Sequence, residues 1–131
     1  MKTMYAMSLA VLLAGTQAVY ANPWEDPDYL ECGTLQTTVD IVECLSDLHD
    51  IWDGRLNSGY REAMEFLPAS RRAGLQEAQR AWIAFRDADC AFPDVLIRGS
   101  LARIYGPSCL SDHTMRRVVD LRGYLGVLDG Y

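Results

Sequence analysis

The sequence predicts an all-α fold, a small four-helix domain with one irregular loop, tied by two disulfides. Apolar residues recur at spacings of three and four over four segments, which is the period of a helix. No segment alternates between apolar and polar residues strictly enough to predict a strand. Cysteine occurs four times, an even number. We therefore expect one disulfide-tied helical domain over residues 32–128.

The N-terminal segment, residues 1–21, has the pattern of a cleavable secretory signal peptide. Lys2 precedes an apolar run over residues 4–14, and the segment ends in Val19-Tyr20-Ala21, with small residues at the positions that signal peptidase reads. The run is too short to cross a membrane, and Thr16 stands where a lipid-modified protein would need cysteine. We therefore expect a periplasmic or secreted chain with no membrane anchor after cleavage.

Residues 22–31 are expected to form an extended, flexible acidic lead-in, because they contain two prolines and four acidic residues. The first helix is expected to begin after Thr37, whose hydroxyl can cap it, with Asp40 near the positive end of the helix. Gly54 is expected to end this helix. Its apolar face comprises Ile41, Leu45, Leu48 and Trp52.

A second helix is expected before Pro68, because proline ends one helix and permits the start of the next. Its apolar face comprises Leu56, Tyr60, Met64 and Leu67. The third predicted helix spans residues 70–90 and is the longest, because this segment is rich in strong helix formers. Its inward face is expected to comprise Leu75, Ala78, Trp82 and Phe85.

Residues 92–107 are expected to form the irregular loop. They contain four residues that interrupt helices, Pro93, Gly99, Gly106 and Pro107. Ser111 is expected to cap the last helix. The apolar face of that helix comprises Met115, Val118, Leu121 and Leu125.

The four cysteines, Cys32, Cys44, Cys90 and Cys109, allow three disulfide connectivities. We predict the pairs Cys32–Cys44 and Cys90–Cys109, because each joins neighbours in the sequence across a short loop. No C-x-x-C motif occurs, and His49 and His113 are separate from the cysteines and from each other in the pattern. We therefore expect neither a metal site nor a cofactor.

Charge is distributed unevenly along the chain, whose formal net charge is −6. Residues 22–54 contain nine acidic residues and no lysine or arginine. This acidic third would attract a basic protein partner, or it is a solvated face that keeps the protein soluble. The negative net charge argues against a nucleic-acid binder.

Catalytic motifs are missing from the sequence, so we expect a protein that is not an enzyme. The sequence has no G-x-S-x-G elbow, no H-E-x-x-H motif and no glycine-rich phosphate loop. The pair Asp112-His113 lies near Cys109, but an oxidised cysteine offers no thiolate nucleophile.

A mixed stripe along the third predicted helix is the most informative pattern in the chain. The spacing aligns five residues on one helical face, Leu75, Gln79, Trp82, Arg86 and Cys90. One interpretation makes Gln79 and Arg86 a recognition pair beside an aromatic platform. The other, which we favour, makes them buried hydrogen-bonding groups that fix neighbouring segments.

These residues carry a resemblance to the LprI-like lysozyme-inhibitor family. The N-terminal cysteine pair is followed by an L-N-x-x-Y element and by a helix reading L-x-x-x-Q-x-x-W-x-x-x-R-D-x-x-C. The matching residues here are Leu56, Asn57 and Tyr60, then Leu75, Gln79, Trp82, Arg86, Asp87 and Cys90. The closing pattern is matched by Gly99-Ser100, Cys109, Thr114-x-x-Arg117 and Leu121.

The resemblance implies a helical, disulfide-tied domain of the cell envelope and, for at least one branch, lysozyme inhibition. An inhibitor that binds and occludes a muramidase needs groups that meet the two catalytic carboxyl groups, which arginine does well. The candidate inhibitory residues are therefore those of the irregular loop, Arg98, Ser100, Arg103 and Tyr105. The alternative is a monomeric, non-enzymatic structural or protein-interaction module of the envelope with another partner.

Overall fold

The computed structural model describes residues 25–128 and contains helices and no strand over that range. The elements are α1 (Pro27–Cys32), α2 (Thr38–Phe66), α3 (Ala69–Ala91), the short 3₁₀ helix η2 (Phe92–Val95) and α4 (Ser100–Leu128). The all-α prediction is confirmed. The expected signal peptide lies outside the described residues. None of the described helices is long and apolar enough to span a membrane.

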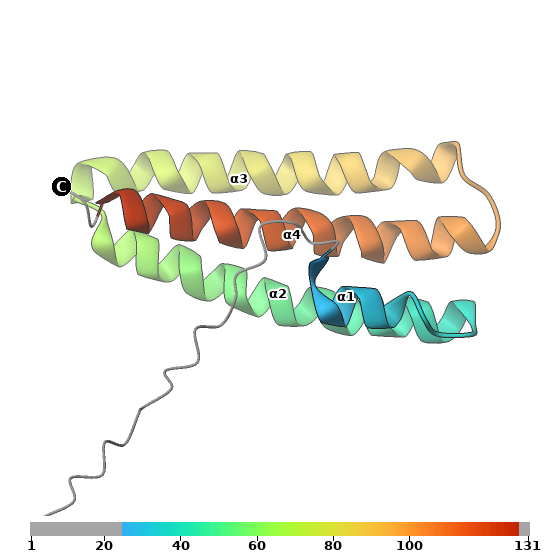
Figure 1. Cartoon of the computed structure of the whole chain (residues 1–131). Coiled ribbons are helices and arrows are strands. Elements are labelled where there is room, and N and C mark those ends of the chain that lie inside the picture. The colour runs from blue at the N-terminus through green and yellow to red at the C-terminus, as the bar shows by residue number, and fades with distance from the viewer. Residues whose placement is uncertain (1–24, 129–131) are drawn as a thin grey trace, which may run out of the picture.

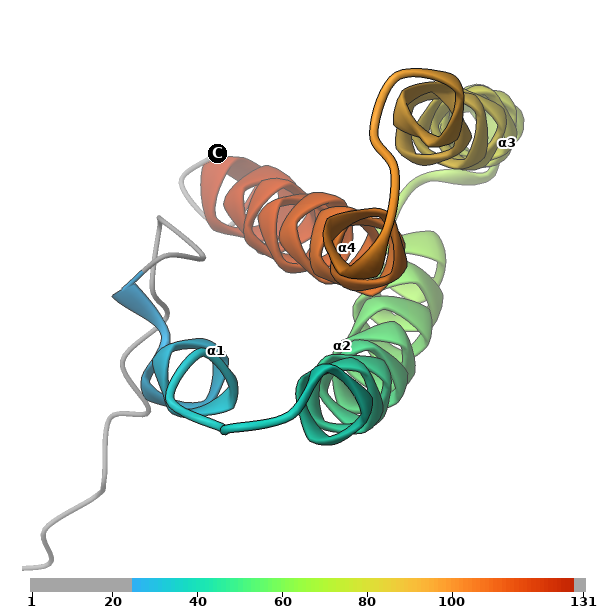
Figure 2. The ribbon, with the colours of Figure 1, turned by 90° about the vertical axis from the view of Figure 1, so that its right-hand side faces the viewer.

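Helix α4 lies at the centre of the arrangement. Successive long helices run antiparallel, so α2 and α4 run in the same direction and α3 in the opposite one (Figure 1). Viewed along the bundle, α2 packs against one side of α4 and α3 against another, while α1 lies beside α2 (Figure 2). The pair α2–α4 makes most of the contacts between elements, and α3 packs chiefly on α4.

The hydrophobic core lies between α2 and α4. It comprises Leu48, Trp52 and Leu56 from α2 and Met115, Val118 and Leu121 from α4, all buried. Each such side chain contributes about 1.5–3 kcal/mol through its burial. The predicted apolar stripes therefore meet each other, as the helical period required.

The two helices expected on either side of Gly54 are one continuous helix, α2. Gly54 is exposed, and nothing lies within 4 Å of where its side chain would be. Glycine inside a helix costs about 1 kcal/mol, which is less than the gain from burying Trp52 and Leu56 on either side of it. The expected cap is present, because Thr37 Oγ1 accepts a hydrogen bond of 3.1 Å from the Asp40 amide.

The acidic lead-in was wrongly expected to be extended throughout, because residues 27–31 are helical. Asp26 is buried and caps α1: its Oδ1 accepts hydrogen bonds from the amides of Asp28 at 2.9 Å and Tyr29 at 3.2 Å. Pro27 occupies the first helical position, which suits its fixed φ. The hydroxyls of Tyr29 and Ser108 share a hydrogen bond that fastens α1 to α4.

The irregular segment is much shorter than the expected 92–107, because α4 begins at Ser100 and contains Pro107. Gly99 has φ 78°, the left-handed conformation that turns the chain from η2 into α4. Pro107 removes one helical hydrogen bond, but the disulfide at Cys109 and the Tyr29 contact at Ser108 hold the segment around it. Ser111, expected as a cap, is instead fully buried and donates to the Leu45 carbonyl at 3.1 Å.

Candidate functional site

Two disulfides fasten the helices, with the predicted pairing. Cys32–Cys44 joins the end of α1 to α2 across a Cα–Cα distance of 5.5 Å. Cys90–Cys109 joins the end of α3 to α4 across 5.6 Å. The second disulfide therefore joins α3 to α4 next to the connection between them, which runs through η2 (Figure 1).

The inward face of α3 is the mixed stripe, and the apolar face predicted for this helix is right at Leu75 and Trp82 but wrong at Ala78 and Phe85. Gln79 and Cys90 are buried, and Trp82 is partly buried. Phe85 was expected to face the core but is 57% exposed, and Ala78 is also exposed. The polar residues face inward because α4 offers them hydrogen-bonding partners.

The motif residues of α3 pair with those of α4. The buried Arg117 donates from Nε to Gln79 Oε1 at 3.0 Å. Arg86 donates from Nη1 to the buried Thr114 Oγ1 at 3.5 Å and holds the exposed Asp87 carboxylate at 2.9 Å. Gln79 and Arg86 thus both make hydrogen bonds from α3 to α4.

Trp82 lies beside both of these arginines. The Arg86 guanidinium carbon is 5.0 Å from the ring centroid of Trp82, and that of Arg117 is 5.7 Å away. Arg117 also lies 4.0 Å from Asp120, so its buried charge has both a carboxylate and an aromatic face nearby. Together these hydrogen-bonded and charged side chains form a polar layer that joins α3 to α4. Burying any one of them without its partner would cost free energy.

A groove of about 250 Å³ lies between α2 and α3. Five motif residues from two parts of the sequence line it together: Leu56, Asn57, Tyr60, Gln79 and Arg86. Asn57 donates to Asp53 Oδ2 at 3.1 Å, which orients its amide at the groove wall. Leu75 and Trp82, by contrast, pack against the core.

The candidate inhibitory residues occupy the α3–α4 connection and the start of α4, not one loop. Arg98 lies in the connection and is exposed. Ser100, Arg103 and Tyr105 lie in the first two turns of α4, with Ser100 and Arg103 exposed and Tyr105 partly buried. Helical geometry therefore fixes the positions of three of the four residues.

Exposed apolar side chains accompany these arginines, and the sequence reasoning missed them. Phe92, Leu96 and Leu101 are 63%, 69% and 59% exposed. The sequence did contain a signal for this exposed apolar surface, because three large apolar residues lie within a segment that proline and glycine interrupt. We define the hairpin tip as Phe92, Leu96, Arg98, Leu101 and Arg103.

The end of α1 and the start of α2, both within the acidic third, lie at the same end of the bundle as the hairpin tip (Figure 1). The turn between α1 and α2 and the connection between α3 and α4 lie together at that end (Figure 1). Glu31, Asp40 and Glu43 are exposed there or close by along α2. A partner that approaches this end meets negative helices and a tip that carries two arginines.

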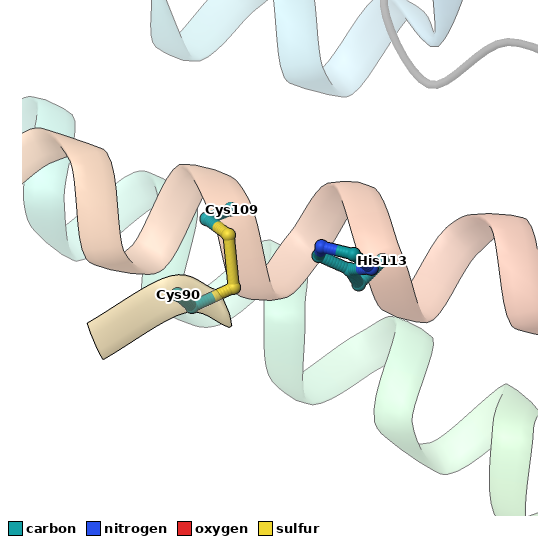
Figure 3. A group of neighbouring side chains, drawn as sticks. All are labelled: Cys90, Cys109 and His113. Carbon is teal, nitrogen blue, oxygen red and sulfur yellow. A yellow bond between two sulfur atoms is a disulfide. The ribbon is translucent and has the colours of Figure 1, made fainter. Parts of the chain in front are cut away.

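His113 lies beside the second disulfide, although the sequence reasoning treated it as separate from the cysteines. Its imidazole and the sulfurs of Cys90 and Cys109 have ligand atoms within 4.8 Å of one another (Figure 3). Its Nε2 is 2.9 Å from Asp89 Oδ2, and its ring meets Phe85 edge-on. The spacing of four from Cys109 was a signal that could have placed it on the same helical face.

Comparisons with known proteins identify one family and two relatives. The family described as Lysozyme inhibitor LprI matches residues 31–121. The uncharacterized protein R02472 of Rhizobium meliloti (strain 1021) is 29% identical over 131 residues, covering 89% of this chain and 91% of that protein. The uncharacterized protein YecT of Escherichia coli (strain K12) is 32% identical over 66 residues, 41% of each chain. No solved structure matches. The matched range contains both disulfides, the groove and the hairpin tip, and the chain belongs to the LprI lysozyme inhibitor family.

Proposed function

We propose that this protein is an exported, monomeric inhibitor of a lysozyme-type muramidase that binds the enzyme and occludes its cleft. The observation that carries the proposal is the family match over residues 31–121. Two disulfides support export, because such bonds persist in oxidising compartments. The inhibitor performs no chemistry of its own.

The hairpin tip is the element that we assign to the cleft. Muramidase clefts work with two carboxyl groups, and an arginine guanidinium forms paired hydrogen bonds with a carboxylate. Arg98 and Arg103 are exposed and free to make such hydrogen bonds with an enzyme. The neighbouring side chains of Phe92, Leu96 and Leu101 offer apolar surface that binding would bury. The Cys90–Cys109 disulfide next to the tip reduces the conformational freedom that binding would otherwise remove.

The acidic helices next to the tip would accelerate the encounter. Lysozymes are typically basic, and complementary charge raises association rates. Residues 22–54 supply nine acidic residues and no lysine or arginine. In this arrangement the acidic surface attracts the enzyme, and the arginines of the tip meet the carboxylates inside its cleft.

The proposal is tested by the rate at which a lysozyme clears a suspension of bacterial cell walls. The parent protein should slow lysis, and Arg98→Ala with Arg103→Ala should weaken inhibition at least tenfold. The control is Arg71→Ala with Arg122→Ala, which removes the same charge from exposed residues at the opposite end of the bundle (Figure 1). Equal inhibition by both double variants would show that the hairpin tip does not take part in inhibition.

A second candidate function is an interaction module of the envelope with another protein partner. The observation that favours it is the groove between α2 and α3, which gathers Asn57, Tyr60, Gln79 and Arg86 away from the tip. This function gains the stronger support if saturating protein at low salt leaves lysis by several lysozyme types unchanged. Tyr60→Ala should then weaken capture of the partner from an envelope extract, whereas Arg98→Ala should not.

A further inference from the structure

The end of α3 and the middle of α4 bring together three groups that bind soft metal ions. Cys90 comes from α3, while Cys109 and His113 come from successive turns of α4 (Figure 3). One ligand atom from each lies within 4.8 Å of the others. The disulfide occupies the two sulfurs in the oxidised chain.

The distances suit a shared ion once the disulfide is reduced. Zinc binds thiolate sulfur at about 2.3 Å and imidazole nitrogen at about 2.0–2.1 Å, which places neighbouring ligand atoms roughly 3.5–4 Å apart. Two of the three ligands are four residues apart on one helix, so the helix itself fixes their separation. The Cα atoms of Cys90 and Cys109, 5.6 Å apart, need little movement to bring both thiolates to one ion.

The surroundings of His113 resemble those of a metal-binding histidine. Asp89 Oδ2 lies 2.9 Å from its Nε2, so the carboxylate can accept the proton of that nitrogen in a hydrogen bond. Histidines that bind metals usually give their second ring N–H to a carboxylate, which orients the ring and makes the other nitrogen more basic. This arrangement leaves Nδ1 to bind an ion.

We propose that Cys90, Cys109 and His113 form a metal site when the chain is reduced, and that the site binds a thiophilic ion such as Zn²⁺. A dithiol reductant supplies two electrons and two protons, breaks the S–S bond and becomes a disulfide itself. The two thiols lose their protons to solvent when the ion binds, and neutral His113 contributes its Nδ1 lone pair. Water occupies the fourth position. The ion then joins α3 to α4 where the disulfide joins them in the oxidised chain.

The test is a zinc titration of the full chain, reduced with a phosphine under argon, against a chromogenic chelator. Cys32→Ser with Cys44→Ser removes the other pair of thiols and should still bind one zinc per chain. The matched variant Cys90→Ser with Cys109→Ser should bind at least a hundredfold more weakly. With Co²⁺ in place of Zn²⁺, the variant Cys32→Ser with Cys44→Ser should show a thiolate-to-cobalt charge-transfer band, and the variant Cys90→Ser with Cys109→Ser should not.

His113 and Asp89 separate this site from binding by two thiols alone. His113→Ala should weaken zinc binding at least tenfold, and Asp89→Asn should weaken it about ten- to a hundredfold. Both variants should keep the helical circular dichroism of the parent when oxidised. Zinc binding that is unaffected by His113→Ala, or that is equal in the two cysteine-pair variants, overturns the proposal. So does a reduced chain that loses its helical signal and does not regain it with zinc.

Discussion

Arg117 of α4 donates through Nε to Oε1 of Gln79 on α3 at 3.0 Å, and both side chains are buried. This bond joins two motif elements that are 38 residues apart in the chain. The bond gives a physical reason for the family pattern, because the arginine buried in α4 needs an acceptor and the side-chain amide oxygen of Gln79 supplies it. The motif on α3 is therefore in large part the complement of the motif on α4.

Gln79→Ala is expected to lower the free energy of unfolding by about 1.5–3 kcal/mol, because it leaves the buried Arg117 guanidinium without its acceptor. Urea denaturation of the oxidised protein measures this loss. Gln76→Ala, an exposed change of the same kind on the same helix, should stay within about 0.5 kcal/mol of the parent. Similar losses in both variants would mean that the bond contributes little.

Gly54→Ala is expected to stabilise the protein by about 0.5–1 kcal/mol, since the position lies inside α2 and alanine is the better helix former. Nothing lies within 4 Å of the added methyl group, so no contact opposes the change. Thermal unfolding followed by circular dichroism should show a higher Tm. A lower Tm would indicate that α2 bends or opens at this residue in solution.

Tyr29 should make stability depend on pH in the alkaline range. Burial raises the pKa of its hydroxyl, Asp112 raises it further, and the hydrogen bond with Ser108 acts in the opposite direction. The folded state therefore favours the neutral hydroxyl of Tyr29, and this preference contributes to the free energy of unfolding. The contribution is fully present below the tyrosine pKa of the unfolded chain, about 10, and it is lost as pH rises through the pKa of the folded chain. The parent should therefore lose more stability between pH 8 and pH 11 than Tyr29→Phe does, as urea denaturation would show. Parallel pH curves would rule out this linkage.

Inhibition of a lysozyme should weaken as salt rises from about 0.01 M to about 0.15 M, where the screening length falls from roughly 30 Å to roughly 8 Å. The expected change is in the association rate, because the acidic helices act before contact is made. Stopped-flow or surface-based kinetics would resolve the association rate from the dissociation rate. An association rate that does not respond to salt would exclude steering by residues 22–54, while leaving occlusion by the tip in place.

Local sequence signals predicted some parts of the structure well. The extent of α3, the cap at Thr37 and both disulfide pairs depend on helix propensity, a short-range hydrogen bond and nearness in sequence. These causes act within a few turns or one loop, so the sequence displays them directly.

The errors occurred where a tertiary contact outweighed a local preference. Gly54 and Pro107 discourage helix, yet both lie inside one, because α2 and α4 bury a continuous stripe against each other. The nearness of His113 to Cys90 depends on how α3 packs on α4, whereas the sequence spacing indicates only that His113 shares a helical face with Cys109. The exposed tip was missed for the same reason, since exposure is a property of packing rather than of sequence.

The lopsided packing of α3 has a consequence for how the molecule opens. The apolar core belongs to α2 and α4, whereas α3 adheres to α4 through a polar layer and partly buried side chains. Its amides should therefore exchange with solvent through a partial opening that leaves the central pair intact. The Cys90–Cys109 bond restrains one end of α3 during such an opening, and the groove against α2 should widen with it.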